Sequence, residues 1–229
     1  MQRIVSREIL DDDLDLAPQE IGKVLDDIWR INRWFGGVTG AFQLLKRICD
    51  RTGLSAVRIL DVGAGDGRLA SRLRRKMDKE GIRAEFVIVD RNFSHLVSRC
   101  PPSAAPAGVV ADALELPFGE GSFDVVMSNL FLHHFSGEPA RRLLRALAAT
   151  AKHAVLMNDL DRRWLAYLFI RHFPFIARSR VSRLDGGASV RQAYTPEEMA
   201  MLAVETGIDN FEIIDLPFLR TGLIVWKSE

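Results

Sequence analysis

Cysteine is scarce in this chain, and no CxxC pair is present. The 229 residues include only two cysteines, Cys49 and Cys100. Two cysteines are too few for a disulfide framework, and without a Cys-x-x-Cys pair the sequence does not predict a structural zinc site of that type. A chain of this length can bury a sizeable core without either device. Two unpaired cysteines fit a reducing compartment best, and we expect a cytoplasmic protein.

Long apolar runs are also missing. The first ten residues lead into three aspartates and lack the apolar run of about 7–15 residues that a secretory signal needs. The longest apolar stretch, Trp164 to Ala177, is interrupted by Arg171 and His172 and is too short to cross a bilayer. We therefore expect no transmembrane segment.

An excess of charge of one sign is absent as well. The chain has 31 basic and 30 acidic side chains, a net charge of +1. This balance disfavours a dedicated nucleic-acid-binding protein, which usually has a basic excess, and it disfavours a disordered chain. The near-zero net charge hides an asymmetry along the chain. Residues 1–29 hold eight acidic and three basic side chains, whereas residues 161–191 hold seven arginines and two aspartates.

The sequence instead has a regular alternation of short apolar runs and amphipathic stretches. Residues 18–50 predict two helices separated by Gly36-Gly37, because the apolar side chains after Pro18 recur with a helical period. Further strands are predicted at 57–62, 86–90, 108–112, 123–128, 153–157, 211–216 and 219–226, and further helices at 69–79, 94–100, 139–152 and 196–206. Repeated β-α alternation predicts an α/β fold with a parallel sheet.

The most informative segment is Asp61-Val62-Gly63-Ala64-Gly65-Asp66-Gly67-Arg68, which follows a predicted strand and opens a predicted helix. Glycines at such a turn let the backbone approach a ligand closely. A dinucleotide site has the spacing G-x-G-x-x-G, whereas the third glycine here comes one residue early. The carboxylate of Asp61 would also repel a pyrophosphate and attract an ammonium group. The pattern therefore disfavours an NAD-type oxidoreductase, which remains an alternative.

Acidic residues also end the next two predicted strands. Asp90 is placed to accept both hydroxyls of a ribose. Asp112 can accept from an adenine amino group while the Ala113 N–H donates to a ring nitrogen; the alternative is that Asp112 only caps the next turn. Together with the glycine turn, these acids predict a pocket for a cationic nucleoside that lacks phosphates.

These residues closely resemble the class I S-adenosylmethionine-dependent methyltransferases over about residues 55–160. The segment 59–67 resembles the family's first motif, Asp90 its ribose-binding acid and Asp112 its adenine-binding acid. The run from Phe123 through His133-His134 to Phe135, with the helix start at 195–198, is similar to the small-molecule branch that includes ubiquinone and menaquinone biosynthesis methyltransferases. The resemblance implies a Rossmann-like seven-stranded sheet, mostly parallel, with the last strand antiparallel and helices on both faces.

The resemblance also implies S-adenosyl-L-methionine as cofactor and a set of residues that bind it. This set is Asp61, Gly63, Ala64, Gly65, Asp90, Arg91, Asp112, Ala113 and Asn129. Enzymes that methylate the exocyclic amines of bases resemble one another in carrying Asn- or Asp-Pro-Pro-aromatic at the end of the fourth strand. The corresponding run here, Asn129-Leu130-Phe131, has no proline, which disfavours a nucleic-acid acceptor.

His133 and His134 are the predicted catalytic residues. A histidine beside the transferred methyl group can deprotonate a phenol or an acidic carbon near neutral pH. The alternatives are that these side chains cap or pack, or that no base is used, because methyl transfer depends mainly on alignment of donor and acceptor. The predicted reaction is methyl transfer to an oxygen or activated carbon of a small, aromatic or lipophilic acceptor. A non-catalytic binding module is the remaining alternative.

We expect one domain in three parts: a helical cap (1–54), a core (55–160 and 195–229) and an insert after the fifth strand (161–194). The insert combines aromatic side chains with arginines, so it predicts either a cover over the acceptor, with Arg191 and Tyr194 as substrate contacts, or a packed helix with a solvated face. Asn158-Asp159 reverses the Asp-Asn order of metal-dependent catechol methyltransferases, and no metal site is expected. The sequence does not indicate an oligomeric state.

Overall fold

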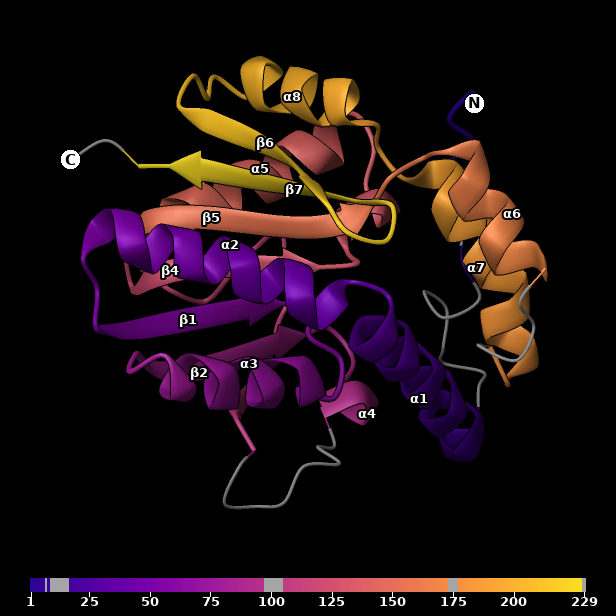
Figure 1. Ribbon diagram of the computed structural model, residues 1–229, viewed down its shortest axis with the longest axis horizontal. Helices are drawn as coiled ribbons and strands as arrows, with labels where there is room; N and C mark the ends of the chain where they lie inside the picture. The colour runs from indigo at the N-terminus through magenta and orange to yellow at the C-terminus, as the bar shows by residue number, and fades with distance from the viewer. Residues whose placement is uncertain (7, 9–16, 97–104, 173–176, 228–229) are drawn as a thin grey trace.

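A seven-stranded sheet forms the centre of the molecule (Figure 1). The computed structural model describes residues 1–6, 8, 17–96, 105–172 and 177–227, with only the backbone for residues 169–172. The strands are β1 (Ala56–Val62), β2 (Arg83–Asp90), β3 (Ala107–Val110), β4 (Phe123–Asn129), β5 (Ala151–Leu160), β6 (Phe211–Leu216) and β7 (Arg220–Trp226), in the spatial order β3-β2-β1-β4-β5-β7-β6.

The pairing within the sheet confirms the predicted topology. β1 pairs in parallel with β2 and β4, β2 with β3, and β4 with β5, whereas β7 runs antiparallel to both β5 and β6. The fold is therefore the Rossmann-like, mostly parallel sheet with an antiparallel last strand. Strand order reverses between β1 and β4, and in open α/β sheets ligands bind beyond the strand ends at such a point.

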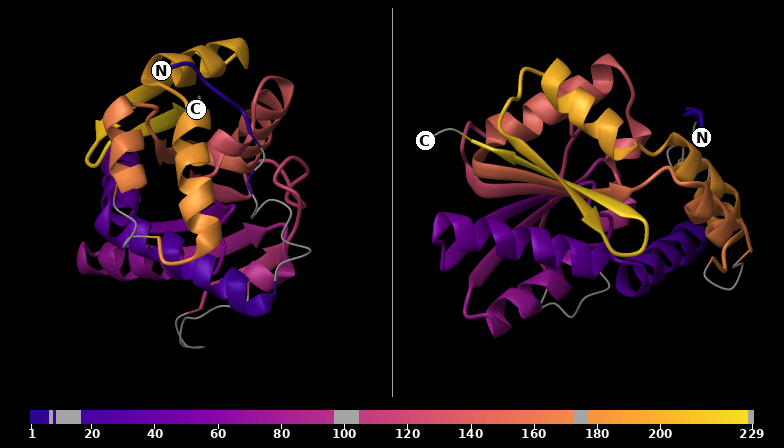
Figure 2. Two further views of the ribbon diagram at one scale, coloured as in Figure 1. Left: turned by 90° about the vertical axis from the view of Figure 1, so that its right-hand side faces the viewer. Right: turned by 45° about the horizontal axis from the view of Figure 1, so that its top comes forward.

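Helices connect the strands and cover both faces of the sheet (Figure 2). They are α1 (Pro18–Trp34), α2 (Gly37–Thr52), α3 (Arg68–Lys79), α4 (Phe93–Leu96), the 3₁₀ turn η2 (Leu132–His134), α5 (Glu138–Thr150), α6 (Trp164–His172), α7 (Arg180–Gln192) and α8 (Pro196–Glu205). The predicted helix at 94–100 begins within α4, and its remainder lies outside the described residues.

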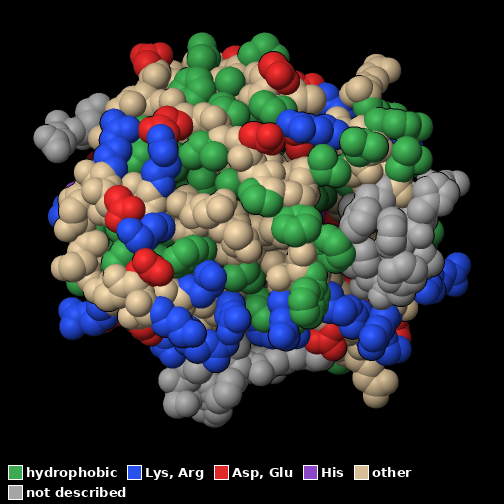
Figure 3. Space-filling model, in the orientation of Figure 1, with side chains coloured by type: hydrophobic (Ala, Val, Ile, Leu, Met, Phe, Trp, Pro, Cys, Tyr) green, Lys and Arg blue, Asp and Glu red, His purple; other side chains and the backbone are tan. Residues whose placement is uncertain are grey.

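Two hydrophobic clusters, one on each face, explain why the central strands are nearly continuous apolar runs. Successive residues of β1 alternate between them: Ile59 packs with α2 and α3, and Leu60 packs with α5 and α8. α3 buries Leu69, Leu73 and Met77 against the sheet and exposes Arg72, Arg75 and Lys79. Figure 3 shows Lys and Arg side chains along the lower part of the face in view, where Figure 1 places α3.

α1, α6 and α7 lie together at the side of the molecule where the parallel strands end (Figures 1 and 2). α2 packs on the sheet, and its buried residues belong to the hydrophobic core. Of the two N-terminal helices, only α1 therefore covers the strand ends. The first residues of the chain run along α7, where the Ile4 N–H donates to the Arg191 carbonyl at 3.1 Å. Among the described residues, no helix has both the length and the apolar character needed to cross a membrane.

Candidate active site

A cavity of about 580 Å³ lies at the ends of the parallel strands. Its volume is within the range of small-molecule sites, roughly 300–1,000 Å³. The glycine-rich turn after β1, the ends of β2 and β4 and the segments that follow β3 and β4 form one part of its wall. α1, α7 and the N-terminal residues Val5, Ser6 and Glu8 also line it. The cavity therefore joins the strand-end acids to the histidine pair after β4.

The turn after β1 requires glycine at two positions. Gly63 has φ +72°, and a Cβ at this residue would lie 2.4 Å from Cδ2 of Phe131. Gly65 has φ +58°, and its N–H donates to Oδ2 of Asp90 at 3.0 Å. Left-handed backbone and close approach both favour a residue without a side chain. These contacts bring the turn against the end of β2 and leave its backbone facing the cavity.

Asp61 places a buried carboxylate beside this turn. The side chain is 1% exposed, and its Oδ2 has no hydrogen-bond partner among the described residues. Burial, together with the charge of Asp90, raises the pKa of Asp61 to about 8. A buried carboxylate without a partner is energetically costly and is stabilised when a cation comes close. Asp61 therefore suits a ligand with an ammonium group, as S-adenosylmethionine has.

Asp90 holds two backbone segments with one carboxylate. Its Oδ1 accepts from the Asn92 N–H at 3.0 Å, while its Oδ2 accepts from Gly65. Asp112 accepts from the Leu114 N–H at 2.8 Å, so it does cap the turn after β3, and it lines the cavity as well. Every other predicted cofactor residue also lines the cavity, namely Asp61, Gly63, Ala64, Gly65, Asp90, Arg91, Ala113 and Asn129.

The side chain of Asn129 belongs to a buried chain of amides. Its Nδ2 donates to Oδ1 of Asn32 in α1 at 2.9 Å, and its Oδ1 accepts from Nδ2 of Asn158 in β5 at 2.9 Å. The same Asn158 nitrogen donates to the Gly37 carbonyl at 3.0 Å. Since these bonds are buried, they fix α1 and the start of α2 over the strand ends.

Asp159 holds the ring of His133 in one orientation. Its Oδ1 lies 2.7 Å from Nδ1 of His133 and accepts from the Leu160 N–H, and its Oδ2 accepts from the His133 N–H at 3.1 Å. Burial raises the pKa of Asp159, but the charge and hydrogen bonds of His133 outweigh burial and keep the pKa below its ordinary value. A carboxylate accepts only, so Nδ1 carries the hydrogen and Nε2 is the atom that faces away from Asp159.

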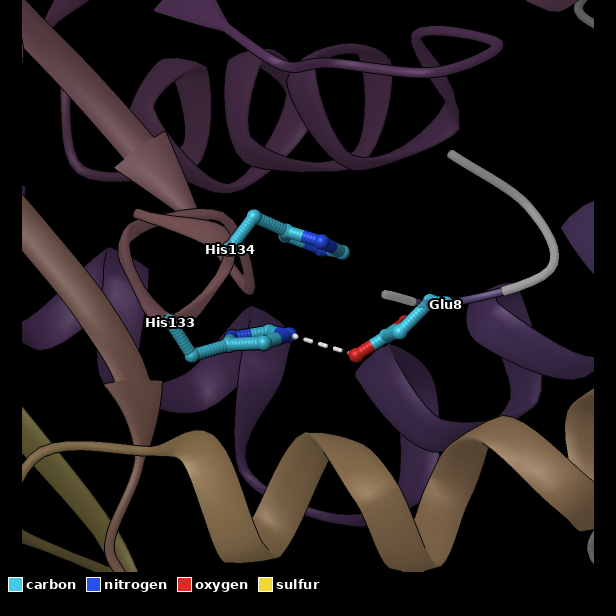
Figure 4. Close-up of side chains that lie close together, drawn as sticks. All are labelled: Glu8, His133 and His134. Atoms are coloured by element: carbon cyan, nitrogen blue, oxygen red, sulfur yellow. Dashed lines mark ion pairs between the residues drawn. The ribbon is translucent and has the colours of Figure 1, made fainter. Parts of the chain in front are cut away.

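Glu8 lies opposite Nε2 of His133, with its Oε1 at 3.6 Å (Figure 4). The rings of His133 and His134 are 4.3 Å apart, and both point toward Glu8. Ligand atoms of the three residues all lie within 4.8 Å of one another. No metal site is expected from the sequence, and Glu8 is not predictable as a site residue, because no local motif links it to a histidine 125 positions away.

The predicted substrate contacts Arg191 and Tyr194 do not line the cavity. Tyr194 is 7% exposed, its Oη donates to the Phe135 carbonyl at 2.8 Å, and the guanidinium of Arg3 lies 3.8 Å from its ring centre. Both residues therefore contact the N-terminal segment, since Arg191 accepts from Ile4. α7 presents a different set to the cavity: Ser182, Asp185, Gly186 and Ser189.

The insert is predicted to cover the acceptor with aromatic side chains and arginines, and only part of it lies within the described residues. Trp164 is 60% exposed and stacks on Tyr167, with ring centres 5.6 Å apart. The side chains of Phe169, Phe173 and Phe175 lie outside the described residues. Of the described insert, only small and acidic side chains of α7 reach the cavity, so no arginine of this part faces the acceptor space.

A family model described as a methyltransferase domain matches residues 59–154. This match identifies residues 59–154 as a methyltransferase domain. The match spans the glycine turn, both strand-end acids and the histidine pair. The cofactor of this domain is S-adenosyl-L-methionine, in agreement with the buried Oδ2 of Asp61, which has no hydrogen-bond partner among the described residues. The narrower resemblance to the ubiquinone and menaquinone branch stays a prediction.

Solved structures with the same fold extend over nearly the whole chain. A SAM-dependent methyltransferase from Aquifex aeolicus has 18% identity and a TM-score of 0.62, covering 92% of this chain and 98% of its own. The plantazolicin methyltransferase BpumL, solved with a desmethyl analogue and SAH, has 13% identity and a TM-score of 0.68 over 93% and 92%. Magnesium protoporphyrin IX methyltransferase from Synechocystis PCC 6803, solved with SAM, has 14% identity and a TM-score of 0.59 over 96% of both chains.

Proposed function

We propose that this methyltransferase transfers the sulfonium methyl group to an oxygen or an activated carbon of a small, aromatic or lipophilic acceptor. The observation that carries the proposal is that one cavity joins the cofactor-type acids to the His133–Asp159 pair. A donor bound at the acids and an acceptor bound at the imidazoles would meet within this cavity. The two solved enzymes named above for plantazolicin and magnesium protoporphyrin IX support a small-molecule acceptor.

At the cofactor end, each acid has a distinct task in this proposal. Asp61 binds the ammonium group of the methionine part, Asp90 accepts the ribose hydroxyls, and Asp112 with the Ala113 N–H binds the adenine edge. Asp90 already holds the Gly65 N–H, so it also positions the glycine turn under the methionine part. In this proposal the acceptor binds at the histidine end of the same cavity.

The acceptor end combines apolar side chains with the two imidazoles. Its wall includes Val5, Ile28, Ile31, Phe131, Phe135 and Leu160. Such a surface favours a lipophilic or aromatic acceptor by excluding water around it. His133 and His134 promote loss of the acceptor's proton, while Asp159 acts as a positioning residue through the ring of His133.

The reaction balances without an outside oxidant or reductant. When bound, S-adenosylmethionine would supply the methyl group: sulfur would keep the electron pair of the methyl–sulfur bond, and S-adenosylhomocysteine would be the product. A lone pair or carbanion of the acceptor forms the new bond to the methyl carbon, and the acceptor's proton is lost. The cavity aligns donor and acceptor, and alignment of this kind is worth several kcal/mol, up to about 7–11 in favourable cases.

An acceptor screen with isotope-labelled methyl donor tests the proposal. Phenols, hydroxylated lipids and acidic carbon compounds are compared with amines and nucleic acids, and mass spectrometry locates the label on oxygen, carbon or nitrogen. We expect label on oxygen or carbon of a small acceptor. We expect turnover to fall in His133→Ala and Asp159→Asn with S-adenosylhomocysteine binding retained. His153→Ala, on β5 beside Asp124, is the matched control. Label only on amines or nucleic acids would refute the acceptor class.

A further inference from the structure

We propose that Glu8, His133 and His134 bind a divalent transition-metal ion, with Zn²⁺ as the model case, at the acceptor end of the cavity. Glu8 is 6% and His133 3% exposed, and His134 is partly buried. The ligand atoms of all three lie within 4.8 Å of one another. Figure 4 shows the two imidazoles approaching from the turn after β4 and the carboxylate from the N-terminal segment.

The orientation of His133 is that of a metal ligand. Oδ1 of Asp159 accepts from Nδ1 of His133, and Oδ2 of Asp159 accepts from the backbone N–H of His133. A metal-binding histidine almost always donates its second ring N–H in this way, which fixes the ring and makes the free nitrogen more basic. The free nitrogen, Nε2, lies 3.6 Å from Oε1 of Glu8. Two ligands of a tetrahedral zinc ion lie roughly 3.4 Å apart at ordinary bond lengths, so little movement is needed.

Glu8 is held by its own set of hydrogen bonds. Its Oε1 accepts from Oγ of Ser189 at 2.6 Å and from Nε2 of Gln192 at 2.5 Å, both on α7. The Ser6 N–H in turn donates to Oε1 of Gln192 at 3.3 Å. These hydrogen bonds fix the orientation of the Glu8 carboxylate, as outer hydrogen-bond partners do for the ligands of metal sites.

The donor set selects the class of ion. Two imidazoles and one carboxylate are the ligands of several catalytic zinc sites, whereas Mg²⁺ and Ca²⁺ prefer sites made of oxygen alone. Three protein ligands leave a coordination position for water or for the acceptor. The three residues line the same cavity as the predicted cofactor residues, so a ligand in that position faces the methyl donor.

The use of the ion in catalysis rests on the proposed function, whereas its binding does not. A cation bonded to the acceptor oxygen lowers the pKa of that oxygen, so the proton leaves to water and the resulting anion attacks the methyl group. In this arrangement the imidazoles promote ionisation as ligands, and neither of them has to accept the proton.

Metal titration of the full-length, untagged protein tests the proposal. Chelator-treated protein is titrated with Zn²⁺ by calorimetry and with Co²⁺ by visible absorption, which reports coordination by nitrogen and oxygen. We expect one ion per chain. We expect Glu8→Gln and His134→Ala to weaken binding by about tenfold or more. His153→Ala removes an imidazole outside the cavity, and its affinity should be unchanged.

A stabilising shift with S-adenosylhomocysteine shows in each variant that the fold and the cofactor end are intact. The proposal is overturned if the wild-type protein, while binding S-adenosylhomocysteine, takes up no ion. It is also overturned if Glu8→Gln and His134→Ala both bind the ion as the wild type does. Metal binding in the absence of methyl transfer would instead count against the proposed function alone, so the two failures are distinguishable.

Discussion

The buried carboxylate of Asp61 makes affinity for the cofactor depend on pH. Its pKa is about 8, raised by burial and by the charge of Asp90, so at pH 7 about one unliganded molecule in ten carries the charge. Binding an ammonium group requires the charged form. Each pH unit below 8 therefore weakens binding by about tenfold, or about 1.4 kcal/mol, and binding at pH 7 releases close to one proton.

The same shift has a defined sign for stability. The pKa of Asp61 is higher in the folded protein than in the unfolded chain, so between about pH 4 and 8 the folded, unliganded state binds more protons. Stability of the unliganded protein consequently falls as pH rises through this window. Cofactor binding removes the penalty, because the ligand's positive charge stabilises the ionised carboxylate.

Calorimetry with S-adenosylhomocysteine, which keeps the ammonium group, measures this effect. We expect the dissociation constant to fall about tenfold between pH 6 and pH 7 and to level off above pH 8. Buffers of different ionisation enthalpy count the released proton. Asp61→Asn should remove this slope, and Asp124→Asn, at the start of β4, should keep it. Equal affinity from pH 6 to 8 in the wild type, with no proton released, would refute the reasoning.

Three further predictions concern single residues. Asp90→Ala should weaken S-adenosylhomocysteine binding about 100-fold, as expected for two lost hydrogen bonds to a charged group; an unchanged calorimetric affinity would contradict its ribose role. Gly63→Ala combines left-handed backbone strain with a clash against Phe131. Urea unfolding should show that it lowers the free energy of unfolding by about 1–3 kcal/mol more than Gly207→Ala does. Gly207 is the control because it has φ +80° but no neighbour within 4 Å. Arg220→Met should cost about 1.5–3 kcal/mol in the same assay, because the buried Nε donates to the Phe35 carbonyl at 2.6 Å; stability equal to the wild type would count against this anchor.

The elements that were predictable from the sequence are those set by local pattern. β1 is a nearly continuous apolar run because both faces of a central parallel strand are buried. Thr195 caps the start of α8: its side chain accepts from the Glu198 N–H while the Glu198 side chain accepts from the Thr195 N–H, and that capping box is visible in the sequence. The glycine turn and strand-end acids were placed together because parallel strands end at one edge of the sheet.

The acceptor end could not be predicted in the same way, because its contacts join distant parts of the chain. Glu8 meets His133 only after the N-terminal segment has packed along α7. Arg191 and Tyr194 were predicted from their place at the end of the insert, but the helical period of α7 turns Ser182, Asp185 and Ser189 toward the cavity. Hydrophobic pattern indicates that a helix is amphipathic, and tertiary packing decides which polar residues face a site.

Ligand-induced thermal stabilisation tests most directly the claim that the cavity binds S-adenosylmethionine through its strand-end acids. At 100-fold excess over the dissociation constant, S-adenosylhomocysteine should stabilise the protein by about 2.7 kcal/mol, and NAD should give no shift. Asp90→Ala should lose most of the shift at the same ligand concentration. Stabilisation by NAD, or no stabilisation by S-adenosylhomocysteine, would contradict the account.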